Sequence, residues 1–300
     1  MSHSLRAPRS HALALGAWSP PFRLASLRSP GLRAPVLVVV ALAVALVTPW
    51  VAMDVALAAR PWTIGIDPGD AFAYITVNHV VMAAAALALV LALGRPASSW
   101  GIAIGRWRLT ARHLLVVIPV LLVLSFGYDA APYLLAGTRP PLAADPTPVA
   151  VAGTLAFQWL FVGVAEELFY RGLILGLLHD ALDRRRVSDL PSRMHDTPDA
   201  PARRRRLRRP RGLARGVSLP AIISAGIFAL AHGIFYGRAF FLPVTFDPSW
   251  GQLAWTFGLG LYCAMLRERT GSLLGPIAAH NVSNGLVLTM TYLAAGVIRL

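Results

Sequence analysis

The chain has 300 residues, of which 56% are hydrophobic and only 14% charged, with a mean hydropathy of +0.59. This apolar excess excludes an ordinary soluble domain and indicates that a lipid bilayer is part of the protein's solvent. All 28 basic residues are arginine and the net charge is +14, a balance also found in nucleic-acid-binding proteins. The positions of the arginines favour a membrane surface instead.

The apolar residues fall into seven blocks, each close to the 20 or so residues that a helix needs to cross a hydrocarbon core of about 30 Å. In chain order the predicted spans are residues 35–57, 71–94, 113–136, 153–180, 217–237, 250–267 and 272–296. Because a helix satisfies its own backbone in lipid, the blocks predict an all-α, polytopic transmembrane bundle of about seven to eight spans. We divide the chain into a basic tail, 1–34, and one membrane domain, 35–300.

The arginines outside the spans indicate the orientation. Five lie in the first 34 residues, four between 95 and 112, twelve between 184 and 215, and two at 267 and 269. An inside N-terminus places all four groups in the cytoplasm and leaves four arginines outside, at 60, 139, 238 and 299. The positive-inside rule therefore predicts a cytoplasmic N-terminus and an external C-terminus.

The stretch 183–216 combines twelve arginines with four aspartates and has no apolar periodicity, so we expect a loosely ordered cytoplasmic loop. Its run Arg203–Arg206 suits anionic lipid headgroups or RNA, and we favour the lipid surface and predict no nucleic-acid partner. The loop should attract acidic or membrane-anchored peptides toward a cavity open to the cytoplasm or the inner leaflet.

The strongest functional signal is a group of ionisable residues inside the fourth span, where charge is costly. Glu167 and Arg171 are four residues apart with the acid first, so they are predicted to pair on one helix face. Glu166 lies about 100° around the axis, without a partner on its own helix. An unpaired buried carboxylate suits a general base that acts on water, whereas the pair also fits a purely structural role.

Three further spans carry polar groups. His232 ends the pattern Phe228-x-x-x-His in the fifth span, and His280 and Asn284 share one face of the seventh. Together with Glu166 they form the inventory of a water-activating site with oxyanion donors. The pair Asn78-His79 in the second span is predicted only to hydrogen-bond between helices. Cys263, the single cysteine, is expected to be a buried thiol.

The motifs Glu-Glu-x-x-x-Arg at 166–171, Phe-x-x-x-His at 228–232 and His-x-x-x-Asn at 280–284 resemble the CPBP intramembrane protease family. That family includes type II CAAX prenyl endopeptidases and bacterial ABI or bacteriocin-processing proteins. The resemblance covers about residues 150–296, which would form the catalytic core. It implies a membrane-embedded endopeptidase, expected in the cytoplasmic membrane of a bacterium, with membrane lipids and a peptide or membrane protein, lipid-modified or not, as partners.

Carried over, the resemblance implies that Glu166 activates water with help from His232, while His280 and Asn284 stabilise the oxyanion. Glu167, Arg171 and Phe228 would support these residues or bind substrate. A divalent metal such as zinc on Glu166, His232 and His280 is compatible with the residue types, and so is a metal-free Glu–His mechanism. Two other functions stay open, a non-catalytic scaffold or immunity protein of the same fold and a proton-coupled transporter.

Overall fold

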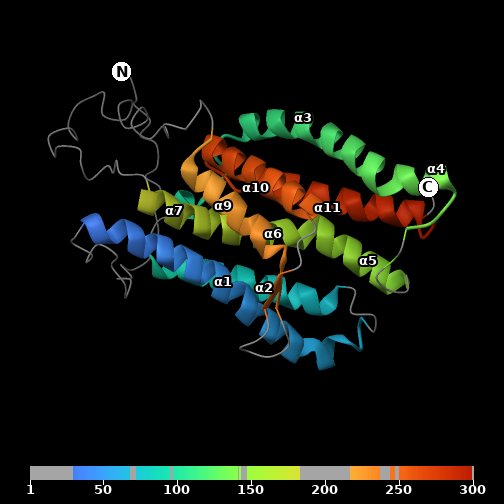
Figure 1. Cartoon of the computed structure of the whole chain (residues 1–300), viewed down its shortest axis with the longest axis horizontal. Helices are drawn as coiled ribbons and strands as arrows, with labels where there is room; N and C mark the ends of the chain where they lie inside the picture. The colour runs from blue at the N-terminus through green and yellow to red at the C-terminus, as the bar shows by residue number, and fades with distance from the viewer. Residues whose placement is uncertain are drawn as a thin grey trace, which may run out of the picture.

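The computed structural model describes residues 30–67, 72–94, 97–140, 142, 147–182, 217–236, 244–246 and 250–298. These residues form a bundle of long helices that lie side by side, roughly along the long axis of the molecule (Figure 1). The predicted all-α membrane bundle is therefore confirmed. The tail before residue 30 and the arginine-rich loop 183–216 lie outside the described residues, so what the sequence predicts for them stays a prediction.

Each of the seven predicted blocks contains helix, although the boundaries differ. The helices are α1 (Pro30–Thr63), α2 (Ala73–Ala92), α3 (Trp107–Ser125), α4 (Ala131–Ala136), α5 (Pro148–Ala156), α6 (Val162–Glu167), α7 (Leu175–Leu182), α9 (Leu219–Ala231), α10 (Trp250–Thr270) and α11 (Leu274–Ala294). Short π-helical segments join α3 to α4, α5 to α6 and α6 to α7. The fourth span is thus one interrupted helix of 35 residues, Pro148–Leu182, longer at both ends than predicted.

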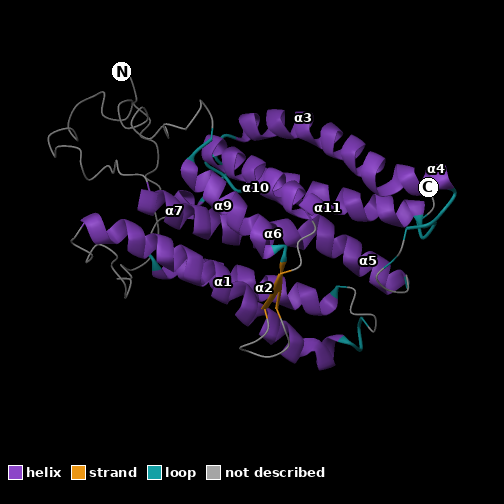
Figure 2. Cartoon of the chain, viewed as in Figure 1, coloured by secondary structure: helices purple, strands orange, loops and turns teal. Residues whose placement is uncertain are grey.

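The predicted fifth span, 217–237, is wrong after Ala231. Helix α9 ends at Ala231 after 13 residues, which corresponds to a length of about 20 Å. The chain then enters strand β1 (Ile234–Tyr236), which pairs antiparallel with β2 (Val244–Phe246) in the hairpin coloured orange in Figure 2. Apolar composition extends through both helix and strand, so hydropathy alone gave no sign of the change in backbone structure.

Among the described residues, four helical stretches are long and apolar enough to cross a membrane, at residues 34–63, 73–92, 107–125 and 148–182. Helix α9 is apolar but shorter, and α10 and α11 have 21 residues each with a more polar composition. In α11 the polar side chains include His280, Asn281 and Ser283, all of which are buried. Other helices, rather than lipid, surround these groups, which removes most of the cost of placing them at membrane depth.

Two helices from other parts of the chain pack around α6, and a third packs close by. Helix α2 and helix α11 both pack directly against α6, and α9 packs against α7, α10 and the π-helical segment that follows α6. In Figure 1 the end of α7, the start of α9 and the turn from α10 to α11 lie at one end of the bundle, and α4 and the C-terminus lie at the other. The first end is the one that the arginine distribution assigns to the cytoplasm.

Candidate active site

The two glutamates of the acidic motif 166–171 lie between two π-helical segments of the fourth span, Phe157–Phe161 and Leu168–Ile174, and its Arg171 lies within the second. A π-helical turn holds an extra residue, so it changes the direction in which the following side chains point, and such turns are frequent at functional sites. Between them, the six residues of α6 carry Glu166 and Glu167 at its last two positions. The interruptions therefore set which neighbouring helix each carboxylate faces.

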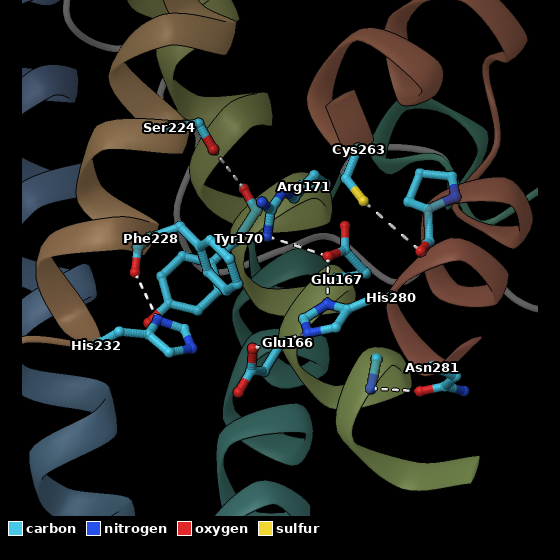
Figure 3. Close-up of polar contacts among 12 residues, drawn as sticks. Glu166, Glu167, Tyr170, Arg171, Ser224, Phe228, His232, Cys263, His280 and Asn281 are labelled. Atoms are coloured by element: carbon cyan, nitrogen blue, oxygen red, sulfur yellow. Dashed lines mark hydrogen bonds and ion pairs between the residues drawn. The ribbon is translucent and has the colours of Figure 1, made fainter. Parts of the chain in front are cut away.

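Glu167 is the centre of a buried chain of charged contacts. Its Oε1 lies 3.1 Å from an Arg171 guanidinium nitrogen, with both side chains fully buried, and 2.8 Å from Nδ1 of His280 on α11. The predicted pairing of Glu167 with Arg171 is confirmed, and Figure 3 shows both contacts. Because a carboxylate oxygen only accepts, Nδ1 of His280 donates to Glu167 and the ring is held in one orientation.

Glu166 has two histidine neighbours rather than none. Its Oε1 lies 3.1 Å from Nε2 of His79 on α2, and its Oε2 lies 3.6 Å from Nε2 of His280. The prediction that Glu166 is unpaired on its own helix holds, but partners from two other helices reach it. Of the pair Asn78-His79, predicted only to hydrogen-bond between helices, His79 does so, and its partner is Glu166 of the acidic motif. An intramembrane histidine beside an asparagine in an otherwise apolar helix was the signal for this partner.

His232 and Phe228 approach the same region from the end of α9. Nδ1 of His232 donates to the backbone oxygen of Phe228, 2.8 Å away, which leaves Nε2 for another partner. The Phe228 ring packs edge-on against both His232 and His280, with centroid distances of 4.6 and 5.7 Å, and the Arg171 guanidinium lies 4.1 Å above it. Figure 3 shows these rings grouped beside Glu166. Phe228 thus contacts both His232 of its own motif and Arg171 of the acidic motif.

The two asparagines of the seventh span have different surroundings. Asn284, one turn beyond His280, is half-buried, and its side chain makes no hydrogen bond within the described part of the chain. The buried Asn281 accepts a 2.7 Å hydrogen bond from the Gly163 backbone and donates to the Leu160 carbonyl. A methyl group on Gly163 would collide with Asn281, so the glycine permits this close approach of α6 and α11. Asn281 is a helix-packing residue that the sequence analysis did not single out.

A zinc ion, which the sequence analysis left open, would require Glu166, His232 and His280 to point at one centre. Within the described residues, no group of three His, Cys, Asp or Glu side chains is arranged to hold a metal ion. His280 lies 3.6 Å from Glu166, but His232 makes no polar contact with either residue within the described part of the chain. These side chains as placed do not fit a zinc ion, so no step below involves one.

Two further predictions concern the route by which substrate reaches the site and the thiol of Cys263. A cavity of about 380 Å³ lies at the start of α3, lined by Gly105, Arg106, Trp107, Arg108, Leu109 and Arg112, and none of the motif residues lines it. The predicted substrate route along the loop 183–216 falls outside the described residues. Cys263 is a buried free thiol, as predicted.

Residues 148–286 match the family model described as type II CAAX prenyl endopeptidase Rce1-like. No curated protein and no solved structure gives a significant match. The matched segment begins with α5 and includes all three sequence motifs, whereas α1 to α4 lie before it. Residues 148–286 are therefore similar to the Rce1-like family of type II CAAX prenyl endopeptidases, in agreement with the resemblance seen in the motifs.

Proposed function

We propose that this protein is a membrane-embedded endopeptidase that hydrolyses a peptide bond of a membrane-associated protein or peptide, with Glu166 as the base that activates water. One observation carries the proposal. Glu166 has one carboxylate oxygen held by His79, while the other is buried, faces His280 at 3.6 Å and has no hydrogen-bond partner among the described residues. A fixed carboxylate with one free oxygen beside an imidazole suits the removal of a proton from water.

In the first step Glu166 takes a proton from water as the water oxygen bonds to the scissile carbonyl carbon. The carbonyl electrons move to oxygen and form a tetrahedral oxyanion. His280 is suited to stabilise this charge through Nε2–H when both of its nitrogens are protonated, because its Nδ1 is anchored by Glu167 and Arg171. Asn284, whose amide is not otherwise engaged within the described residues, is proposed as the second donor.

In the second step the carbon–nitrogen bond breaks and the leaving amine takes the proton held by Glu166. His232 is proposed to assist this transfer through Nε2, since its Nδ1 is bound to the Phe228 carbonyl. The immediate products are a carboxylic acid and an amine, and the acid then loses its proton to water, so every atom of the added water is accounted for. Phe228 and Arg171 keep the rings of His232 and His280 in place, and they are proposed to support the site without touching the reacting atoms.

The decisive test compares the wild-type protein with Glu166→Gln in lipid vesicles, using a fluorogenic peptide with a prenylated cysteine and its unprenylated twin. Glutamine keeps the size of the side chain but removes the base, so we expect kcat to fall by about 100- to 10,000-fold with normal folding. The matched control is Glu268→Gln, because Glu268 contacts His179 and Ser218 and not the motif residues. Full activity of Glu166→Gln would refute the mechanism.

The peptide pair also addresses the substrate class. Preference for the prenylated peptide would support a CAAX-type substrate, and equal cleavage would point to leader peptides or tails of membrane proteins. Comparing the membrane proteomes of cells that carry wild-type or Glu166→Gln protein would identify natural substrates. Folded wild-type protein that cleaves neither peptide and leaves the membrane proteome unchanged would favour the scaffold function. Proton flux that depends on Glu166 would favour the transporter.

A metal-free reaction predicts that chelation leaves activity intact. We expect 1,10-phenanthroline to leave kcat within about twofold of its starting value, because Glu166, and no bound cation, activates the water. Activity that is lost with the chelator and returns with zinc would show that Glu166, His232 and His280 rearrange to hold a metal. The nonchelating isomer 1,7-phenanthroline is the control for effects on the membrane.

A further inference from the structure

Helix α2 contributes a histidine to the site although it lies outside the family match, which begins at residue 148. His79 faces α6, and its Nε2 is 3.1 Å from Oε1 of Glu166, a residue 87 positions further along the chain. Only 8% of His79 is exposed. The contact therefore joins the part of the bundle that carries the family motifs to the part that does not.

Three contacts hold the His79 ring in one orientation. Nδ1 is 2.9 Å from the backbone oxygen of Ile75 in the preceding turn, so this nitrogen donates its proton there. Phe157, at the start of the first π-helical segment of the fourth span, packs against the ring with a centroid distance of 5.0 Å and an interplanar angle of 85°. Glu166 binds the opposite nitrogen. Rotation of the ring would break both polar contacts, so His79 presents Nε2 to Glu166 in a fixed direction.

This contact determines which oxygen of Glu166 is available. A short contact between Nε2 and Oε1 needs a proton between the two atoms, whether the imidazole or the carboxyl group carries it. In either case Oε1 is occupied, and the plane of the carboxyl group is fixed by one end. Oε2 is then the oxygen that faces His280, 3.6 Å away. Without His79, the carboxyl group would be free to rotate about its last bond.

We propose that His79 is the positioning residue of the base: it holds Oε1 of Glu166 so that Oε2 is directed toward His280 and the attacking water. The inference rests on the proposed endopeptidase function and adds a fourth helix, α2, to the three that bear the family motifs. His79 acts through Glu166 and does not itself contact the reacting atoms. The N-terminal part of the chain thus takes part in catalysis as well as in membrane anchoring.

The test uses full-length protein in vesicles with the prenylated peptide. His79→Leu removes the donor, and we expect kcat to fall by about 100-fold at unchanged KM, because a base displaced by about 1 Å loses activity on that scale. His79→Gln retains an N–H group that reaches Glu166, and we expect it to stay within about tenfold of wild type. The matched control is His113→Leu, since His113 on α3 packs against Tyr262, away from Glu166. Its kcat should be unchanged.

Wild-type kcat in folded His79→Leu would overturn the inference, and so would equal losses in the Leu and Gln variants, because a structural role does not require a donor. If His79→Leu does not fold, His79→Phe replaces it, since phenylalanine keeps a ring against Phe157. The two proposals fail in different ways. An inactive wild type refutes the endopeptidase, whereas an active wild type, an inactive Glu166→Gln and an unaffected His79→Leu refute only the role of His79.

Discussion

The helices after residue 147 bury a group of ionisable side chains, whereas the helices before residue 137 expose many large apolar side chains. In the later half, Glu167, Arg171 and His280 are at most 2% exposed. In the earlier half, large apolar residues cover the outside, with Leu115 75% and Leu135 89% exposed. Lipid reverses the arrangement of a soluble protein, since apolar groups face the solvent and ionisable groups are kept where protein surrounds them. The half with the buried group of Glu167, Arg171 and His280 is also the half that contains the family match.

Helix α2 connects the two halves, because it contributes a polar residue to the site. It belongs to the earlier half, yet it buries Asn78 and His79, and His79 contacts Glu166 on α6. The polar site therefore extends across the boundary of the family match. The comparison predicts three kinds of substitution effect, which decrease from the charged centre to the lipid-facing surface.

The largest effect on stability is expected at the charged centre. Arg171→Leu leaves the fully buried Glu167 without its cation, which should lower the free energy of unfolding by about 3–5 kcal/mol. Unfolding by denaturant titration in detergent measures it. The control is Arg112→Gln, an exposed arginine at the start of α3, which should change little. A loss below 1 kcal/mol for Arg171→Leu would mean that lipid or water compensates the charge.

A smaller effect is expected where α10 packs against this centre. A methyl group on Gly260 would lie 2.8 Å from an Arg171 nitrogen and 3.0 Å from the Phe228 ring. Gly260→Ala should therefore cost about 1–3 kcal/mol and lower kcat, because Arg171 supports Glu167 and His280. Gly258, two residues earlier, has open space around it, so Gly258→Ala should be neutral or slightly stabilising. Equal results for the two variants would contradict the packing described for α10.

The smallest effect is expected on the lipid-facing surface of the earlier half. Leu115→Ala should change the free energy of unfolding by no more than about 0.5 kcal/mol, since this side chain is 75% exposed. The same change at Leu173, which is 1% exposed, should cost about 2–5 kcal/mol because it leaves a cavity. A large loss at Leu115 in the same unfolding assay would show that α3 packs against another protein rather than lipid.

The amino-acid sequence alone determined the features that depend on local spacing or on composition. Apolar blocks predicted the helical membrane bundle, and the spacing of Glu167 and Arg171 predicted their ion pair, because residues four apart share one helix face. The order of the three motifs also predicted the family to which residues 148–286 are similar. Each of these inferences needs only the regular geometry of a helix or the thickness of a bilayer.

Only the tertiary structure decided which groups from distant parts of the chain meet. The partnership of His79 with Glu166 and the packing role of Asn281 depend on how α2, α6 and α11 lie against one another. The sequence also did not predict the end of α9 at Ala231, since it stays apolar through the helix and into the strand. Hydropathy reports the preference of a residue for lipid, and helical spacing reports neighbours within one helix. Neither of them specifies how one helix is rotated relative to the next, and it is this rotation that places His79 beside Glu166.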